Sequence, residues 1–264
     1  MRRFSLICVI TFSTLIFTAC SNDDDSLPQN TNNYFPLTVN NSWDYDNAFT
    51  ATGQDDFFGS ETMSITGTIQ LSGNDVHEVE SSNPQNSGLS TLILTQGVLY
   101  KNNTGLIYTG EFGLGLPEFS NIAFDIENAP VYNKQVPSGT EMFVQETSFQ
   151  EQFEGFPITL NFKIKTVMGE SLSSLSVNGT NYADVISSQW IIELEVVAGV
   201  PPISTLILEE QKISEITNYF AKDVGMIRSE STTTLNFVDN PLFELEDIDS
   251  ATLQELVNHN IVLD

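Results

Sequence analysis

Basic residues are scarce in this sequence, and their scarcity argues against whole classes of function. The 264 residues include nine Lys and Arg against 35 Asp and Glu, for a formal net charge of −26. Nucleic-acid binding depends on clustered Lys and Arg that displace counterions from phosphates, so we expect no nucleic-acid partner. Hydrophobic residues make up 40% of the chain and aromatic residues 10%. That is enough to form a core in a chain of this length, so the chain is expected to fold.

Histidine and cysteine are nearly absent, which leaves little material for catalysis. His77 and His259 are the two imidazoles, and no HExxH or His/Cys cluster accompanies them. A zinc site needs three or four such ligands, and a serine hydrolase of the common type needs a Gly-x-Ser-x-Gly elbow, which is missing. The acidic segment 239–249 lacks the spacing of a calcium-binding loop, which favours a solvated acidic loop and leaves calcium binding as the alternative. We therefore expect a non-enzymatic protein with no catalytic residues, no cofactor and no metal.

The amino terminus has the pattern of a secretory signal peptide. A cationic start at residues 1–3 precedes a mainly apolar run at residues 4–17. This run is too short for a bilayer core of ~30 Å but suits a signal-peptide h-region. It leads to FTAC at residues 17–20, which resembles a bacterial lipobox, with Phe17 at a place where Leu is commoner. The resemblance implies cleavage before Cys20, a thioether-linked diacylglyceryl group on its sulfur and an acyl chain such as palmitate on its amino group.

Cleavage before Cys20 has consequences for charge and redox chemistry. It removes Cys8, so the lipidated Cys20 is the one cysteine left and no disulfide can form. It also removes Arg2 and Arg3, which leaves seven basic against 35 acidic residues and a net charge of −28. Attachment to a membrane must then come from the acyl chains, at about 0.8 kcal/mol per buried CH₂, and not from basic residues.

A polar tether is predicted at residues 20–33, between the signal peptide at residues 1–19 and a single domain at residues 34–264. Its composition offers almost nothing to bury. Its first residues resemble the export signal that sends lipoproteins of Bacteroidota-type bacteria to the outer face of the outer membrane; they are Ser21, Asn22, Asp23, Asp24 and Asp25. The resemblance implies an outer-membrane protein that faces the cell exterior, and the alternative is one that faces the periplasm.

Period-two patterns predict that the domain is all-β. Apolar residues alternate with polar ones at residues 63–71, 158–165 and 190–196, as in half-buried antiparallel strands. Asn and Gly at residues 101–105 indicate a hairpin. Alanine, a strong helix former, occurs only nine times. We expect both tryptophans, Trp43 and Trp190, to lie in the core.

One short C-terminal helix is predicted at about residues 250–258. Leu253, Leu256 and Val257 fall at helical spacing, and Asp249 is placed as an N-cap. Ile248 and Leu253 could then form a hydrophobic staple. A final strand at residues 261–263 is the alternative, and the two could follow one another.

A family resemblance adds to these local patterns. Residues 34–45 (YFPLTVNNSWDY) resemble the opening of many exported β-rich lipoproteins of Bacteroidota-type bacteria, with Asn40 where that pattern has Gly. Residues 177–185 and 219–227 resemble two later elements of the same group. The resemblance implies a strongly curved antiparallel sheet or incomplete barrel, usually without an assigned activity.

Two further sets of residues are candidate sites. The glycine-rich segment 110–117 is unsuited to phosphate, because it carries Glu111 and no cation, but as a loop it could contact a ligand through Phe112, Leu114 and Leu116. Two Asp-Ser-apolar triplets resemble O-glycosylation sites of Bacteroidota-type exported proteins, at Ser26 and Ser250. Because a transferase needs an exposed hydroxyl, Ser26 in the tether is the favoured acceptor.

Taken together, the sequence favours a lipid-anchored surface protein with an extracellular binding or structural role. The first alternative is a carrier that holds a hydrophobic ligand in the cavity of a curved sheet. A weaker alternative is a glycan hydrolase that uses paired carboxylates, although 35 acidic residues make some such pair inevitable. The lipid bilayer is the one partner that the sequence predicts, while the extracellular ligand and the oligomeric state stay open.

Overall fold

The computed structural model describes residues 33–113, 123–153, 155–200, 203–239 and 245–263. Residues from Asn32 to Asp264 form one compact unit. No helix in these described residues is long and apolar enough to span a bilayer. The elements, in chain order, are β1 (Ser42–Ala51), β2 (Phe57–Leu71), β3 (Asn74–Ser81), the 3₁₀ turn η1 (Pro84–Asn86), α1 (Leu89–Thr95), β4 (Gly97–Lys101), β5 (Gly105–Gly113), β6 (Ala123–Asn133), β7 (Glu141–Phe153), β8 (Phe156–Val177), β9 (Thr180–Val200), β10 (Ile203–Ala221), β11 (Gly225–Leu235) and β12 (Ile248–Asn260).

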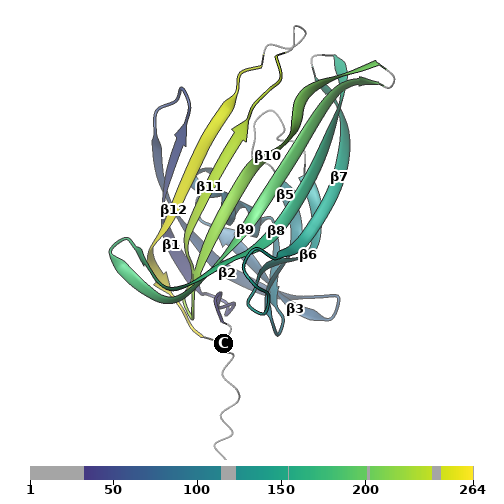
Figure 1. Cartoon of the computed structure of the whole chain (residues 1–264). Helices are drawn as coiled ribbons and strands as arrows, with labels where there is room; N and C mark the ends of the chain where they lie inside the picture. Colours follow the sequence, from purple (N-terminus) through teal and green to yellow (C-terminus); the bar gives the residue numbers. More distant parts are fainter. Residues whose placement is uncertain (1–32, 114–122, 154, 201–202, 240–244, 264) are drawn as a thin grey trace, which may run out of the picture. The chain divides into compact units, whose positions relative to one another are not determined.

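The twelve strands form one antiparallel sheet that curves into an incomplete barrel (Figure 1). Its order is β6-β5-β4-β3-β2-β1-β12-β11-β10-β9-β8-β7, so the chain runs up and down and β1 meets β12. Successive connections therefore alternate between two ends. We call base the end with the β2–β3, β4–β5, β6–β7, β8–β9 and β10–β11 connections, drawn at the bottom of Figure 1, and rim the opposite end. The expected all-β curved sheet is confirmed.

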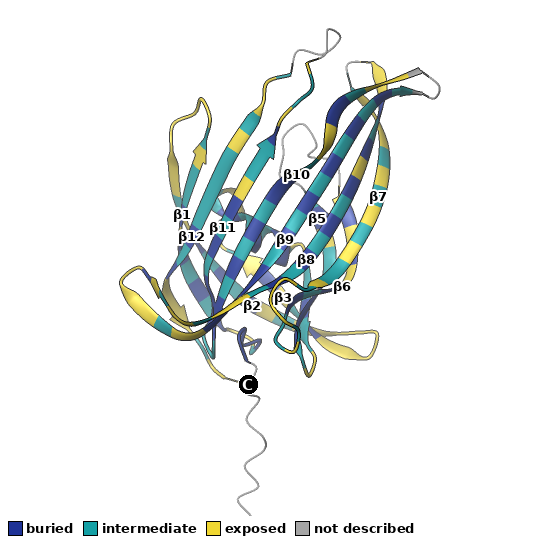
Figure 2. Cartoon of the chain, viewed as in Figure 1, coloured by how far each residue is buried: buried dark blue, intermediate teal, exposed yellow. Residues whose placement is uncertain are grey.

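Alternation of side chains explains why these segments are strands. In β9, Trp190, Ile192 and Leu194 are buried, while the intervening Glu193 and Glu195 lie on the outer face. Figure 2 shows the resulting stripes along the strands. The predicted strands at residues 63–71, 158–165 and 190–196 and the predicted hairpin between β4 and β5 are all present.

Side-chain contacts bridge the two end strands of the sheet, β6 and β7. These two strands end the sheet order, so the hydrogen-bonded ladder has two edges there. Gln145 Nε2 of β7 donates to the carbonyl oxygen of Asp125 in β6 at 2.9 Å. Phe124 of β6 packs against Phe149 and Phe162, with ring centroids 5.2 and 4.7 Å apart. Edge-to-face aromatic packing thus replaces backbone pairing along this seam.

The predicted helix at residues 250–258 is wrong, because this segment is the central part of β12. Its backbone pairs with β1 on one side and β11 on the other. A helix would pair its own amides but leave the backbone groups of β1 and β11 without partners, so the strand is the more stable conformation here. Asp249 accepts a hydrogen bond from Thr234 Oγ1 at 2.8 Å and caps no helix. The alternative strand at residues 261–263 is also absent, since these residues have no regular structure.

The segment before β1 packs into the base. Tyr34, Phe35 and Leu37 are buried there, and the rings of Phe35 and Trp43 stack with centroids 4.9 Å apart. Trp43 Nε1 donates to the Val224 carbonyl oxygen at 2.6 Å. Gly225, in the same turn at φ +116°, is required by this contact, because a Cβ would lie 2.5 Å from Trp43 Nε1. The predicted core position of Trp43 is therefore confirmed.

A buried carboxylate connects the short helix α1 to four strands. Glu61 of β2 is 4% exposed, and its Oε1 accepts hydrogen bonds from Asn47 Nδ2, the Gly88 amide and Gln254 Nε2 at 3.0, 2.9 and 2.8 Å. Its Oε2 accepts a fourth, from Ser81 Oγ, at 2.9 Å. Four donors satisfy a charge that would otherwise be costly to bury. The start of α1 is thereby held to β1, β2, β3 and β12.

We predict that Glu61→Gln lowers the free energy of unfolding by about 1–3 kcal/mol, because the new amide group presents hydrogens to donors that need an acceptor. For a domain of this size each kcal/mol corresponds to about 2–4 °C in melting temperature. Thermal unfolding followed by circular dichroism measures the change. The control is Glu80→Gln on the exposed face of β3, expected to stay within about 0.5 kcal/mol of wild type. Equal melting of Glu61→Gln and wild type would refute the structural role of Glu61.

Candidate functional site

A recess of about 530 Å³ lies on the outer face of β1, β2 and β12, covered at one side by η1. We call it the β1 recess. Strand register builds it from two neighbouring rows of side chains that cross the sheet, one apolar and one polar. Its lining residues are Asp46, Asn47, Ala48, Phe58, Gly59, Ser60, Asn83, Asn86, Leu253 and Glu255.

The apolar row crosses the strands in the order Phe58, Ala48, Leu253. Ala48 is paired with Phe58 of β2 on one side and with Leu253 of β12 on the other. The ring of Phe58 is 72% exposed, the highest value among the large hydrophobic side chains of the described residues. An aromatic ring left in water on a rigid strand contributes nothing to the core and is available for a ligand.

The polar row runs parallel to it, two residues along each strand, in the order Ser60, Asp46, Glu255. Asp46 is paired with Ser60 and with Glu255. Arg228 of β11 continues the row. Its Nε lies 3.8 Å from Glu255 Oε1, and its Nη2 lies 2.5 Å from Glu230 Oε1. Arg228 thus offsets part of the charge of the row. Asp46 is exposed, with its carboxylate on the open face of the recess.

Hydrogen bonds in both directions hold the η1 side of the recess to β1 and β2. Asn47 Nδ2 donates to the Asn86 carbonyl oxygen at 2.7 Å, and Asn83 Nδ2 donates to the Ser60 carbonyl oxygen at 3.2 Å. Gly59 allows this close approach, because a Cβ there would lie 2.8 Å from Asn86 Cβ. Asn47 Oδ1 is buried without a hydrogen-bond partner. Asn47 also donates to Glu61, so the buried carboxylate network lies directly beneath the recess.

This combination of groups suits a polyhydroxylated ligand. The faces of sugar rings carry C–H groups that pack on aromatic rings, and their hydroxyls donate to carboxylates and amide oxygens. Small-molecule sites commonly combine an apolar surface with a few fixed polar groups. Phe58, Asp46 and Asn83 supply one of each kind within one recess.

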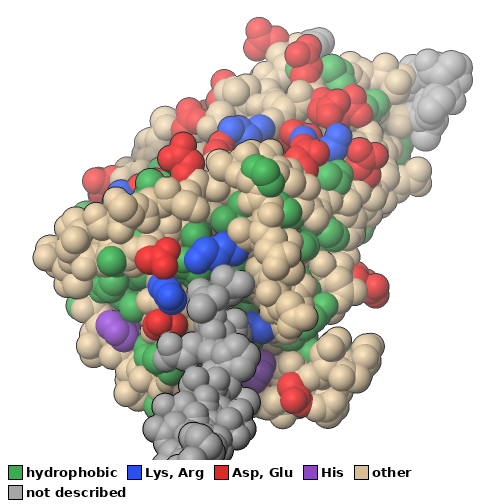
Figure 3. Space-filling model, turned by 60° about the horizontal axis from the view of Figure 1, so that its bottom comes forward, with side chains coloured by type: hydrophobic (Ala, Val, Ile, Leu, Met, Phe, Trp, Pro, Cys, Tyr) green, Lys and Arg blue, Asp and Glu red, His purple; other side chains and the backbone are tan. Residues whose placement is uncertain are grey.

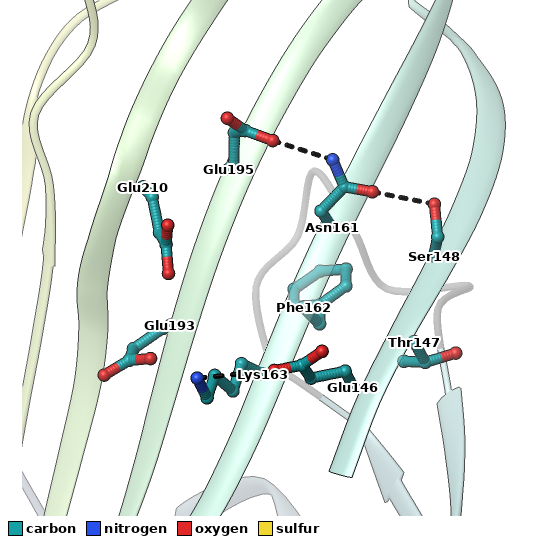
Figure 4. Close-up of a pocket in the computed structure, with 9 residues that line it drawn as sticks. All are labelled: Glu146, Thr147, Ser148, Asn161, Phe162, Lys163, Glu193, Glu195 and Glu210. Carbon is teal, nitrogen blue, oxygen red and sulfur yellow. Dashed lines mark hydrogen bonds and ion pairs between the residues drawn. The ribbon is translucent and has the colours of Figure 1, made fainter.

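A second concavity, of about 510 Å³, lies on the outer face of β7 to β10 (Figure 4). Asn161 Nδ2 donates to Glu195 Oε2, and Ser148 Oγ donates to Asn161 Oδ1, both at 2.8 Å. Lys163 Nζ lies 3.3 Å from Glu146 Oε1, and this hydrogen bond raises the pKa of Lys163. Acidic side chains of this groove are paired with Asn161 and with lysines, and no exposed aromatic ring lines it. We therefore favour the β1 recess.

A cluster of large aromatic side chains packs inside the barrel. Trp190 is 1% exposed and packs against Tyr108 and Phe112, with centroids 5.8 and 6.2 Å apart. Its predicted core position is confirmed. Phe124 and Phe162 extend the same aromatic cluster. The carrier hypothesis needs an open cavity, and this aromatic cluster takes up part of the interior.

The prediction that Phe112 belongs to a ligand-contacting loop is wrong. Phe112 lies in β5, is 0% exposed and stacks on Trp190. Strand alternation points it inward, so the glycines beside it belong to a strand. Leu114 and Leu116 lie outside the described residues, as do Cys20, the export-signal residues 21–25 and Ser26.

The remaining candidates are dispersed over the sheet. Ser250 is half-buried in β12, opposite Ala51 and Thr233, and no Ile248/Leu253 staple covers it because the helix does not form. The two histidines lie on different strands, His77 in β3 and His259 in β12. In the part of the chain that the structure describes, no three His, Cys, Asp or Glu side chains are grouped to hold a metal ion.

Sequence reasoning missed the β1 recess, although one signal pointed to it. Phe57 and Phe58 are consecutive, so in an alternating strand one of them must face outward. The position of Asp46 opposite Glu255, by contrast, depends on the pairing of β1 with β12, which are more than 200 residues apart in sequence. No local pattern shows that pairing.

Comparison with known proteins adds little beyond this geometry. No family model and no curated protein sequence matches the chain. One similar solved structure is an exported protein with a YmcC-like fold from Bacteroides fragilis, at 7% identity and a TM-score of 0.30, covering 86% of this chain and 98% of that one. Another is a lipoprotein from Parabacteroides distasonis, at 13% identity and a TM-score of 0.31, covering 86% and 99%. In both cases export or lipidation is an assignment and not a measurement. At such TM-scores neither likeness supports an inference about function.

We predict that two phenylalanine substitutions differ strongly in their effect on the free energy of unfolding. Phe58→Ser removes an exposed ring and should change the free energy of unfolding by less than about 0.5 kcal/mol. Phe112→Ala empties a buried position and should cost about 3–5 kcal/mol. Urea unfolding followed by tryptophan fluorescence measures both. Strong destabilisation by Phe58→Ser would show that this ring supports the fold and is not reserved for a ligand.

Proposed function

We propose that this chain is a non-enzymatic, lipid-anchored protein of the outer membrane that faces the cell exterior and binds a carbohydrate in the β1 recess. The lipobox-like segment before Cys20 and the acidic residues after it support the anchor and its address. The observation that carries the binding role is the exposed ring of Phe58 beside Asp46 and the η1 amides. A rigid sheet holds these groups in place before the ligand arrives, which lowers the entropic cost of binding.

Lipidation of Cys20 is testable in a bacterial host that processes lipoproteins. Wild-type protein should incorporate a labelled fatty acid and sediment with membranes, while Cys20→Ala should remain unlabelled, because no other thiol survives cleavage. Gel fluorography after metabolic labelling is the measurement. Equal labelling of the two proteins removes the anchor from the proposal. Protease added to intact cells tests the address, and a protein left whole contradicts exposure at the cell exterior.

Carbohydrate binding is testable by affinity electrophoresis in gels that contain soluble polysaccharides such as dextran, levan, mannan and xylan. At least one polysaccharide should retard the wild-type protein, and Phe58→Ser should reduce the retardation about tenfold, the effect of losing one stacking contact of about 1–1.5 kcal/mol. The matched control is Phe156→Ser, which removes a ring that is 43% exposed in β8. Retardation lost equally in both variants, or absent in wild type with every polysaccharide, would contradict the proposal.

The hydrolase alternative would use the same recess, since Asp46 and Glu255 are directly opposed across β1 and β12. Opposed residues of this kind have Cβ atoms about 4.5–5.5 Å apart, and two carboxylates can attack a glycosidic bond from such positions. The binding proposal predicts that a retarding polysaccharide is released unchanged. Reducing ends that accumulate with wild type and not with Asp46→Asn would favour the hydrolase instead.

A further inference from the structure

The up-and-down topology separates charges between the two ends of the barrel. Four of the seven basic residues in the described chain lie on the outer wall in ion pairs with glutamates; they are Lys163, Lys165, Lys212 and Arg228. The other three are at the base, each in or beside a different turn: Lys101, Lys134 and Lys222. Both histidines are also there, His77 in the β2–β3 hairpin and His259 near the end of β12.

The rim has the opposite character. Its described connections contain acidic residues and no Lys or Arg. The acids include Asp55 and Asp56 between β1 and β2, Glu151 near the end of β7, and Asp239, Glu246 and Asp247 between β11 and β12. The base carries acids as well, among them Asp75 and Glu78 in the β2–β3 hairpin, Glu141 at the start of β7, and Asp184 and Asp223, but Lys101, Lys134 and Lys222 lie among them. Asp184 accepts a hydrogen bond from Tyr34, Asp75 accepts one from Gln70, and Asp223 is partly buried.

The base also exposes aliphatic side chains. Ile69 and Leu71, near the tip of the β2–β3 hairpin, are 44% and 42% exposed, and Val262, after β12, is 58% exposed. The hairpin extends beyond the start of β1, because β2 pairs with β1 only as far as Ser64. Figure 3 turns this end toward the viewer and shows hydrophobic, basic and histidine side chains on it, with acidic side chains between them. Aliphatic and basic groups on one face suit the boundary between lipid headgroups and acyl chains.

The chain enters the barrel at this same end. The Asn33 carbonyl oxygen accepts a hydrogen bond from the Asp223 amide at 2.7 Å, in the β10–β11 turn. Tyr34 Oη donates to Asp184 and accepts from Lys134 Nζ, both at 2.6 Å. Burial and the hydrogen bond to Asp184 raise the pKa of Tyr34, so its hydroxyl keeps the proton that it donates. Between Cys20 and Asn33 the chain can span at most about 45 Å. Lipid on Cys20 therefore keeps the base within reach of a bilayer.

We propose that the base is a membrane-contacting face that rests on an anionic lipid surface and turns the acidic rim, with the β1 recess near it, away from the bilayer. The Lys and His side chains lie among lipid phosphates, while Ile69, Leu71 and Val262 reach the headgroup boundary. Turning the barrel over would bring the acids of the rim within a Debye length, about 8 Å, of anionic headgroups, and repulsion opposes that orientation. The proposal rests on the lipid anchor of the proposed function.

The test uses the lipidated mature protein incorporated into vesicles of phosphatidylcholine and phosphatidylglycerol. Because Cys20 is modified, an introduced cysteine is the one thiol available for a fluorophore. Leu71→Cys and Val262→Cys place the fluorophore at the base, and Phe156→Cys places it at the rim at a matched exposure of 43%. Spin-labelled lipids in the bilayer should quench both base fluorophores, about twofold or more above the rim fluorophore.

Two outcomes would overturn the proposal while the anchor stands. In the first, protein that floats with the vesicles shows equal quenching at base and rim. In the second, base quenching is the same in vesicles of phosphatidylcholine alone, which would remove the role of the basic residues. Failure of the wild-type protein to float with vesicles is a different result, because it contradicts the anchor itself.

Discussion

A carboxylate inside the barrel is the constraint on which the rest of this structure depends. Glu61 cannot leave its charge unpartnered in the interior, and the four groups that donate to it come from β1, β3, β12 and the start of α1. Those donors fix where α1 enters the barrel and where η1 lies above β1 and β2. The η1 amides border the β1 recess, so a buried charge positions a surface site. Thr91 of α1 extends the network, accepting a hydrogen bond from Gln254 at 2.7 Å.

The division of labour between faces follows from one sheet with a period of two. Inward positions near the base and along β5 to β9 are aromatic and aliphatic and provide the free energy of folding. Inward positions around α1 are polar and determine its placement. Outward positions are released from both tasks. The acidic excess, Phe58 and the basic residues of the base are found at these outward positions.

Much of the sheet could be predicted from local pattern, because a strand with one buried face alternates apolar and polar residues along its sequence. The failures have physical causes. Leu253, Leu256 and Val257 satisfy helical spacing, yet β1 and β11 offer hydrogen bonds to both edges of that segment, and tertiary pairing outweighs a local pattern. Phe112 is flanked by glycines that suggested a loop, but it belongs to strand β5 and its ring packs against Trp190. The recess could not be predicted, since Asp46 and Glu255 meet only when the first strand pairs with the last.

The contact between β6 and β7 affects how the protein behaves when many copies lie close together. An open sheet ends in two strands whose free amides and carbonyls are templates for another copy of the same chain, and such edges lead to aggregation. Here the two end strands of the sheet cover one another, with Gln145 and the ring of Phe124 between them. The contacts between β6 and β7 thus cover part of the two unpaired strand edges within each molecule. Copies of the chain at high concentration therefore have less free strand edge through which to join into a continuous sheet.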